Sequence, residues 1–118
     1  MQWMRRNRRQ YLKVRESARA LVHDRINHFN ASYRFPLRRV FIKNHRSRWG
    51  SCSERGNLNF NYKIVFLPQE LADYIIVHEL CHLAEFNHSH RFWDLVGQMV
   101  PGHKSLRKQL RALERGGL

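Results

Sequence analysis

The chain has 118 residues, which is enough for one domain with a hydrophobic core and too few for two. Hydrophobic residues make up 42% of it and aromatic residues 12%, a composition that excludes an intrinsically disordered protein. We expect a basic tail over residues 1–9 and a single domain over residues 10–115. No apolar run reaches the roughly 18 residues that a membrane-spanning helix needs, and the arginine-rich start lacks the apolar stretch of a secretory signal. The chain is therefore expected to be cytoplasmic, without membrane contact, and to keep Cys52 and Cys81 as free thiols.

Positive charge dominates the sequence. Lys and Arg number 22 against 9 Asp and Glu, which gives a formal net charge of +13. Such an excess attracts polyanions, of which nucleic acid is the commonest, so nucleic acid is a candidate partner. The basic residues are spread along the chain and form no recognised nucleic-acid-binding motif. A basic domain without a nucleic-acid partner is therefore an equally good interpretation.

The first half of the chain predicts one helix followed by a small sheet. From about residue 8 to 30, apolar residues recur at spacings of three and four, the pattern of an amphipathic helix. The pattern alternates with period two in residues 38–45 and 58–64, which predicts strands. Residues 48–53 predict a further short strand, in which Gly50 permits a close approach of the backbone, and a turn follows it. We expect about three strands in a small antiparallel sheet.

The second half predicts three helices. Pro68 suits the start of a helix that continues to about residues 86–87, where asparagine tolerates the conformation of a sharp turn. Ser89 is suited to cap a second helix that ends before Pro101, and a basic amphipathic helix follows over residues 105–115. The expected fold is α+β, with the sheet packed on the N-terminal and middle helices and two helices at the C-terminus.

The run His78-Glu79-Leu80-Cys81-His82 is the segment around which the chemistry is expected. Positions four apart on a helix differ by about 40° in direction, so His78 and His82 lie one turn apart on one face and can bind one metal ion. Glu79 points about 100° away from His78, close enough to activate a water and poorly placed as a ligand. Histidines on an otherwise apolar helix are costly to bury unless they are paired or bind a metal.

A third ligand is expected from the chain that follows this helix. His88 comes six residues after His82, a spacing at which a chain that turns back can bring another side chain to the metal. His90 is an alternative, because the same loop could present either. Three protein ligands and an open fourth position are typical of a catalytic zinc site, so we predict one Zn²⁺ ion. Two other interpretations are a structural zinc, which leaves Glu79 without a role, and two core histidines beside a surface His88.

The predicted chemistry is hydrolysis at a carbonyl. Zinc lowers the pKa of a bound water, and Glu79 takes its proton during attack and returns it to the leaving amine. The developing oxyanion needs a second donor besides the metal. The candidates, which the sequence does not rank, are Tyr62, Tyr74, His90 and His103.

Two motifs resemble those of a known family. Residues 49–53 read W-G-S-C-S, and residues 74–93 read YIIVHELCHLAEFNHSHRFW. Together they resemble the YgjP-like metal-dependent hydrolases, relatives of the SprT-like and WLM zinc proteases, and the resemblance extends over residues 11–113.

The resemblance implies both a fold and a set of roles. The fold is a compact, minimal zincin of gluzincin-like type over residues 10–115, with His78, His82 and His88 as zinc ligands and Glu79 as the base. It also implies that one short strand lines the cleft and offers its edge to an extended polypeptide substrate. The substrate-binding residues so implied are Trp49, Gly50, Ser51 and Cys52.

Three functions of different classes are compatible with the sequence. The first is a zinc metallopeptidase acting on nucleic-acid-associated proteins, suggested by the +13 charge and by SprT-like relatives that act on DNA-bound proteins. The second is a metal-dependent nucleoside triphosphate phosphohydrolase, similar to a UTP pyrophosphatase, an activity attributed to some YgjP-like proteins; no P-loop or glycine-rich phosphate site is present. The third is a non-enzymatic nucleic-acid-binding module that uses the tail and the last helix. The sequence leaves the oligomeric state open.

Overall fold

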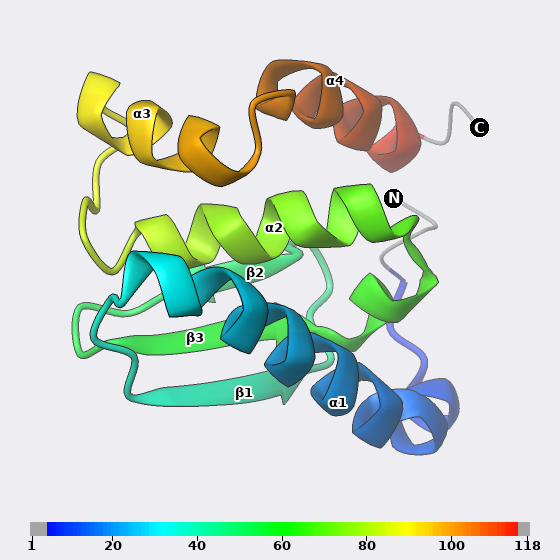
Figure 1. The fold of residues 1–118 in the computed structure, drawn as a ribbon. Helices are drawn as coiled ribbons and strands as arrows, with labels where there is room; N and C mark the ends of the chain where they lie inside the picture. Colours follow the sequence, from blue (N-terminus) through cyan, green and yellow to red (C-terminus); the bar gives the residue numbers. More distant parts are fainter. Residues whose placement is uncertain (1–4, 116–118) are drawn as a thin grey trace.

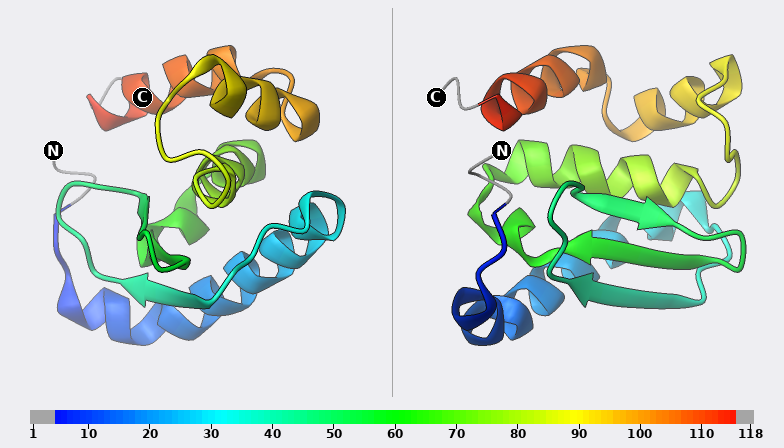
Figure 2. Two further views of the ribbon diagram at one scale, coloured as in Figure 1. Left: turned by 90° about the vertical axis from the view of Figure 1, so that its left-hand side faces the viewer. Right: turned by 180° about the vertical axis from the view of Figure 1, so that it is seen from behind.

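A three-stranded sheet with two helices on one face forms the centre of the molecule (Figure 1). The computed structural model describes residues 5–115. Its elements are α1 (Arg8–Tyr33), β1 (Arg39–Lys43), β2 (Gly50–Cys52), β3 (Asn57–Asn61), the 3₁₀ helix η1 (Tyr62–Phe66), α2 (Gln69–Cys81), α3 (His90–Met99) and α4 (His103–Glu114). Both α1 and α2 cover the same face of the sheet, and α3 and α4 lie beyond α2 (Figures 1 and 2). The α+β class expected from the sequence is confirmed.

The sheet is mixed, with strand order β1-β3-β2. β2 pairs antiparallel to β3, with Gly50 opposite Phe60, whereas β1 pairs parallel to β3, with Arg39 opposite Asn57. The expected all-antiparallel sheet is therefore wrong for one of the two pairings. The chain reverses direction after β1 and again after β2, so β3 runs in the same direction as β1. Because β3 lies between the other two strands, it is the parallel neighbour of β1. This order leaves β2 at an edge of the sheet.

Three element boundaries differ from the sequence expectation. The third strand ends at Asn61 instead of continuing to 64, because the Asn61 side chain accepts a hydrogen bond from the backbone N–H of Lys63 (3.0 Å) and starts η1. The middle helix ends at Cys81 instead of 86–87, because the next residues form tighter i to i+3 bonds, such as Leu83 N–H to Leu80 C=O (3.0 Å). At the N-terminus, α1 already begins at Arg8 inside the expected tail, and residues 1–4 of that tail lie outside the described part.

The core lies between the sheet and the two helices that cover it. Its fully buried side chains come from the sheet, from α1 and from α2. The amphipathic face of α1 and the apolar residues of α2 are therefore both needed to form one core. Burial of each large apolar side chain contributes roughly 1.5–3 kcal/mol. The buried set includes Val22, Ile26, Leu58, Phe60, Ile76 and Leu80. Cys81 is a buried free thiol and Cys52 is a half-buried one. Within the described residues, no helix is long and apolar enough to cross a membrane.

A bidentate ion pair joins α1 to α2. The guanidinium of Arg25 donates to both carboxylate oxygens of Asp73, at 2.8 and 3.0 Å, and both side chains are less than one-fifth exposed (19% and 16%). The hydrogen bond to Asp73 raises the pKa of Arg25 further above its ordinary value, so the guanidinium stays charged.

We expect Asp73→Ala to lower the free energy of unfolding by about 2–3 kcal/mol, because it leaves a largely buried guanidinium without its partner. The matched control is Glu16→Ala, which removes a solvent-exposed pair with Arg19 on the same helix and should change stability by no more than about 0.5 kcal/mol. Urea unfolding of the two variants measures the difference. Equal destabilisation would contradict the role of this pair.

Candidate metal centre

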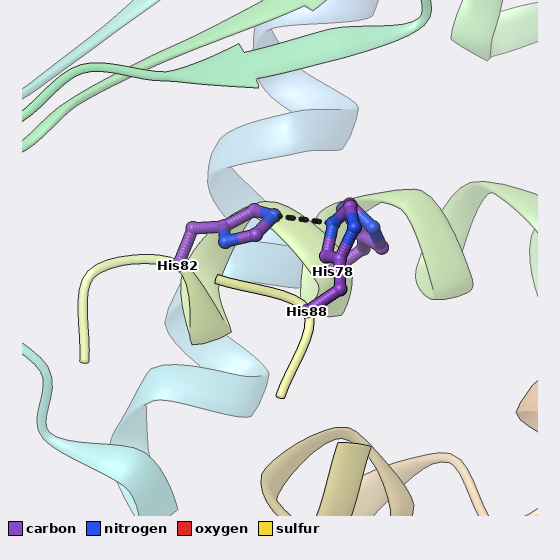
Figure 3. Close-up of side chains that lie close together, drawn as sticks. All are labelled: His78, His82 and His88. Carbon is purple, nitrogen blue, oxygen red and sulfur yellow. Dashed lines mark hydrogen bonds between the residues drawn. The ribbon is translucent and has the colours of Figure 1, made fainter. Parts of the chain in front are cut away.

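Three histidine side chains point toward one another at the C-terminal end of α2 (Figure 3). His78 lies in the last turn of the helix, His82 is the C-cap residue that follows Cys81, and His88 comes from the loop that leads to α3. Their ligand nitrogens all lie within 4.8 Å of one another, and Nε2 of His82 is 3.0 Å from Nε2 of His88. Two imidazole nitrogens on one tetrahedral zinc ion are about 3.3 Å apart. The three residues therefore fit a single metal ion with only small adjustments.

The early end of α2 brings His88 back to the helix. The tight turns after Cys81 reverse the chain, and Ser89 then caps α3 by accepting a hydrogen bond from the N–H of Phe92 (3.3 Å). Between these two fixed points the loop has little freedom, so the position of His88 follows from the two helix ends. The N-cap predicted at Ser89 is confirmed.

Phe92 lies beneath all three histidine rings. Its ring is fully buried and stacks on His82, with ring centroids 4.4 Å apart and planes 24° from parallel. The same ring lies 5.0 Å from His88 and 5.1 Å from His78. Phe92 was not among the residues expected in the site, although it lies four residues after His88, in the run NHSHRFW of residues 87–93.

Hydrogen bonds and burial favour the metal-binding form of the histidines. With its proton on Nδ1, His82 donates to the backbone carbonyl of Glu85 (3.0 Å), which leaves Nε2 with its lone pair toward the site. Nδ1 of His78 lies 3.2 Å from Oε2 of Glu79. Burial lowers the pKa of His82, and burial together with the neighbouring histidines lowers the pKa of His88. Both rings are thus held neutral, the state in which imidazole binds a metal.

Glu79 lies in a cleft beside the three histidines. Its side chain is 9% exposed, and the cleft has a volume of about 170 Å³. The residues that line the cleft come from the start of β2, from α2 and from α4. In the view from behind in Figure 2, α2 lies between β2 and α4. The lining residues are Trp49, Gly50, Tyr74, Ile75, His78, Glu79 and Leu110.

Of the four residues expected on the short strand, the first two line this cleft. Trp49 donates its indole N–H to Oε1 of Glu114 (2.9 Å), which ties the start of β2 to the end of α4. Ser51 accepts a hydrogen bond from the Asn59 side chain at 3.2 Å and so faces the neighbouring strand. Burial raises the pKa of the Cys52 thiol to about 11, with a smaller contribution from the charge of Glu79, so the thiol is protonated at neutral pH.

Gly50 is needed where β2 approaches α2. A Cβ atom at this position would lie 3.0 Å from the carbonyl oxygen of Asn59 and 3.1 Å from Cγ of Glu79. Both distances are shorter than ordinary van der Waals contacts, and one of them is to backbone. The close backbone approach that the sequence predicts at Gly50 thus determines where the Glu79 carboxylate lies.

The four oxyanion candidates lie in different places. Tyr74 lines the cleft, with its ring 5.9 Å from that of His78, and burial raises the pKa of its phenol. The hydroxyl of Tyr62 instead donates to Oε1 of Gln10 in α1 (2.6 Å). His90 has a side chain that is 92% exposed and lies 3.5 Å from Asp94, whereas His103 stacks on Trp93 (5.2 Å) behind the histidine cluster. Among the described residues, the structure thus groups His88 and not His90 with the helix pair.

We expect Gly50→Ala to destabilise the protein by about 1–3 kcal/mol, because the added methyl overpacks the contact between β2 and Glu79. Gly97→Ala is the matched control, since a Cβ there meets His103 at an ordinary 3.8 Å inside α3. That substitution should leave stability unchanged or raise it by up to about 1 kcal/mol, as alanine is the better helix former. Urea unfolding compares the two, and a Gly50→Ala variant as stable as the parent would refute this account of the glycine.

Comparisons with known proteins agree with this geometry. A family profile described as the YgjP-like metallopeptidase domain matches residues 2–113, nearly the whole chain. No curated protein sequence matches the chain.

Two solved structures are similar to the fold. The metallopeptidase zymogen abylysin of Pyrococcus abyssi has a TM-score of 0.68 and 25% identity over 75% of this chain and 90% of its own. The metallopeptidase zymogen jannalysin of Methanocaldococcus jannaschii has a TM-score of 0.64 and 21% identity over 80% of this chain and 95% of its own, and at that identity it supports the fold alone. With the family profile spanning almost every residue and the histidine triad in place, the chain belongs to the YgjP-like metallopeptidase family and is a metal-dependent hydrolase of the peptidase type.

Proposed function

We propose that the protein is a zinc-dependent peptidase that hydrolyses peptide bonds of a polypeptide bound in the cleft, with Glu79 as the general base. The observation that carries this proposal is the convergence of three histidines whose ligand nitrogens lie within 4.8 Å of one another, next to a carboxylate that lines the adjoining cleft. A histidine set of this kind leaves a fourth position open, as catalytic zinc sites do.

The choice of zinc follows from the donor set. Three imidazole nitrogens without a thiolate or a carboxylate ligand suit zinc, and a hydrogen bond from Nδ1 of His82 to a backbone carbonyl is the usual support for a zinc-bound histidine. When bound, the ion supplies Lewis-acid chemistry that acidifies water and polarises a carbonyl.

In this proposal Glu79 performs the proton transfers and Tyr74 stabilises the developing oxyanion. The Glu79 carboxylate takes a proton from the attacking water and gives it to the nitrogen of the leaving amine. Tyr74 lines the same cleft, and because burial raises the pKa of its phenol, the hydroxyl stays protonated and can donate a hydrogen bond to the developing oxyanion. Tyr74 is therefore the oxyanion donor we favour among the four candidates.

A polypeptide is the substrate that the sheet order favours. β2 is an edge strand and its first residues line the cleft, so its free backbone groups can pair with an extended peptide that lies along the groove. A nucleoside triphosphate would need a phosphate-binding loop, which the sequence lacks. Nucleotide hydrolysis and a nucleic-acid-associated substrate stay predictions from the sequence.

Glu79→Gln tests the role of the base. The variant should retain zinc, because the amide preserves the contact with His78, while cleavage of an unfolded test protein should fall by about 10²- to 10⁴-fold. Glu70→Gln, an exposed position in the first turn of the same helix, is the control and should cleave like the parent. Undiminished cleavage by Glu79→Gln would rule out the proposed mechanism.

His88→Ala tests the ligand set. Its affinity for zinc should fall by at least about 100-fold, because two ligands remain of three. His90→Ala should bind zinc as the parent does, since His90 is exposed and beside Asp94. Competition with a coloured chelator, together with metal analysis of the purified variants, measures both affinities. Full zinc occupancy in His88→Ala would remove His88 from the site.

A further inference from the structure

One face of α4 carries a row of positive charges. The side chains recur at spacings of three and four residues, so they project from the same side of the helix, and they line a shallow hollow of about 370 Å³. Within residues 5–115, none of these side chains forms an ion pair with a carboxylate. The row, called here the cationic face, consists of Lys104, Arg107, Lys108, Arg111 and Arg115.

The cationic face begins next to the metal centre. The guanidinium carbon of Arg107 lies 5.4 Å from the centroid of the Trp93 ring. That ring in turn lies 5.7 Å from the ring of His88 and 6.0 Å from the ring of His78. A single aromatic ring therefore separates Arg107 from two of the three histidines.

The same helix forms one wall of the catalytic cleft. Leu110 lines the cleft, and Arg107 and Arg111 flank it along α4, one turn before and one residue after. The same cleft is lined by Trp49 and Gly50, at the start of β2. A peptide that lies along β2 alternates its side chains, so every second one points away from the strand face that packs on the core. A peptide paired with β2 would thus have side chains available for contact with α4, the helix that carries Arg107 and Arg111.

A carboxylate is a group that these arginines are suited to bind. A guanidinium held over an aromatic ring keeps its in-plane N–H groups free for a bidentate contact, and clustered unpaired cations repel one another until an anion joins them. Among the described residues, Glu79 is the only one with a carboxylate that lines the cleft. Positive charge on the rim is therefore available to a substrate.

We propose that Arg107 and Arg111 form a subsite for an acidic side chain of the polypeptide, so that the enzyme prefers segments rich in Asp and Glu. This inference rests on the proposed peptidase function for its substrate class. A peptide is favoured over nucleic acid as the occupant because the cationic face adjoins the peptide groove through Trp93 and Leu110.

The test measures binding, so that it does not depend on turnover. Zinc-loaded Glu79→Gln protein is titrated against a fluorescein-labelled unstructured peptide with a central Asp/Glu cluster and against its Asn/Gln counterpart, and anisotropy is recorded. The acidic peptide should bind about fivefold more tightly. Adding Arg107→Gln and Arg111→Gln should abolish that difference and leave the affinity for the neutral peptide unchanged.

The matched control removes the same charge elsewhere. Arg9→Gln with Lys13→Gln acts on two exposed cations of α1 that are also one turn apart. The preference for the acidic peptide should persist in this control. Equal loss in both double variants would mean that net charge alone attracts the peptide, and the subsite would be overturned.

Two further measurements separate the subsite from its alternatives. If a single-stranded oligonucleotide loses binding in the Arg107/Arg111 double variant while peptide binding is unaffected, the cationic face belongs to nucleic acid and the subsite is overturned. Suppose that the otherwise unmodified chain cleaves neither peptide, but the acidic peptide binds more tightly and the Arg107/Arg111 double variant loses this preference. The peptidase proposal then fails and the subsite is upheld. Cleavage of both peptides at one rate, unchanged by the double variant, overturns the subsite alone.

Discussion

The packing of three imidazole rings on the buried ring of Phe92 is the contact on which the rest of the site depends. A charged histidine is poorly solvated in an apolar environment, and burial lowers the pKa of His82, whose ring stacks on Phe92, so this ring is held in its neutral state. Phe92 belongs to the helix that follows the loop of His88, while the other two rings belong to the helix before it. The metal centre is thus assembled from two helix ends that a single side chain joins.

The sheet contributes to the site through its edge. Because β3 takes the central position, β2 lies at the edge and against α2, where only a glycine allows the approach. The same glycine leaves room for the Glu79 side chain, so the absence of a side chain at this position permits both the strand pairing and the placement of the Glu79 carboxylate. The minimal size of the domain requires such sharing, since few residues remain for separate structural and chemical roles.

Local patterns predicted the local parts of the structure. The helices of the chain, the N-cap at Ser89 and the face shared by His78 and His82 all depend on contacts within a few residues, which periodicity records. The parallel pairing of β1 with β3 was missed because strand order depends on contacts distant in sequence. Tyr62 has the right chemistry for an oxyanion donor, but it lies in η1 and its hydroxyl points toward Gln10 of α1. This direction depends on how η1 packs on α1, which the sequence pattern does not record. The contact of Trp93 with both Arg107 and His88 likewise joins separate elements, and no local pattern in the sequence indicates it.

The last helix, α4, has one buried apolar face and one exposed cationic face. Leu110 and Leu113 are buried and hold α4 on the body of the protein, whereas the cations project from its other side. Exposed charges can be exchanged at a cost of a few tenths of a kcal/mol, while buried leucines cannot. Under the role proposed for Arg107 and Arg111, substitutions on the surface of this one helix change the substrate preference without repacking the core.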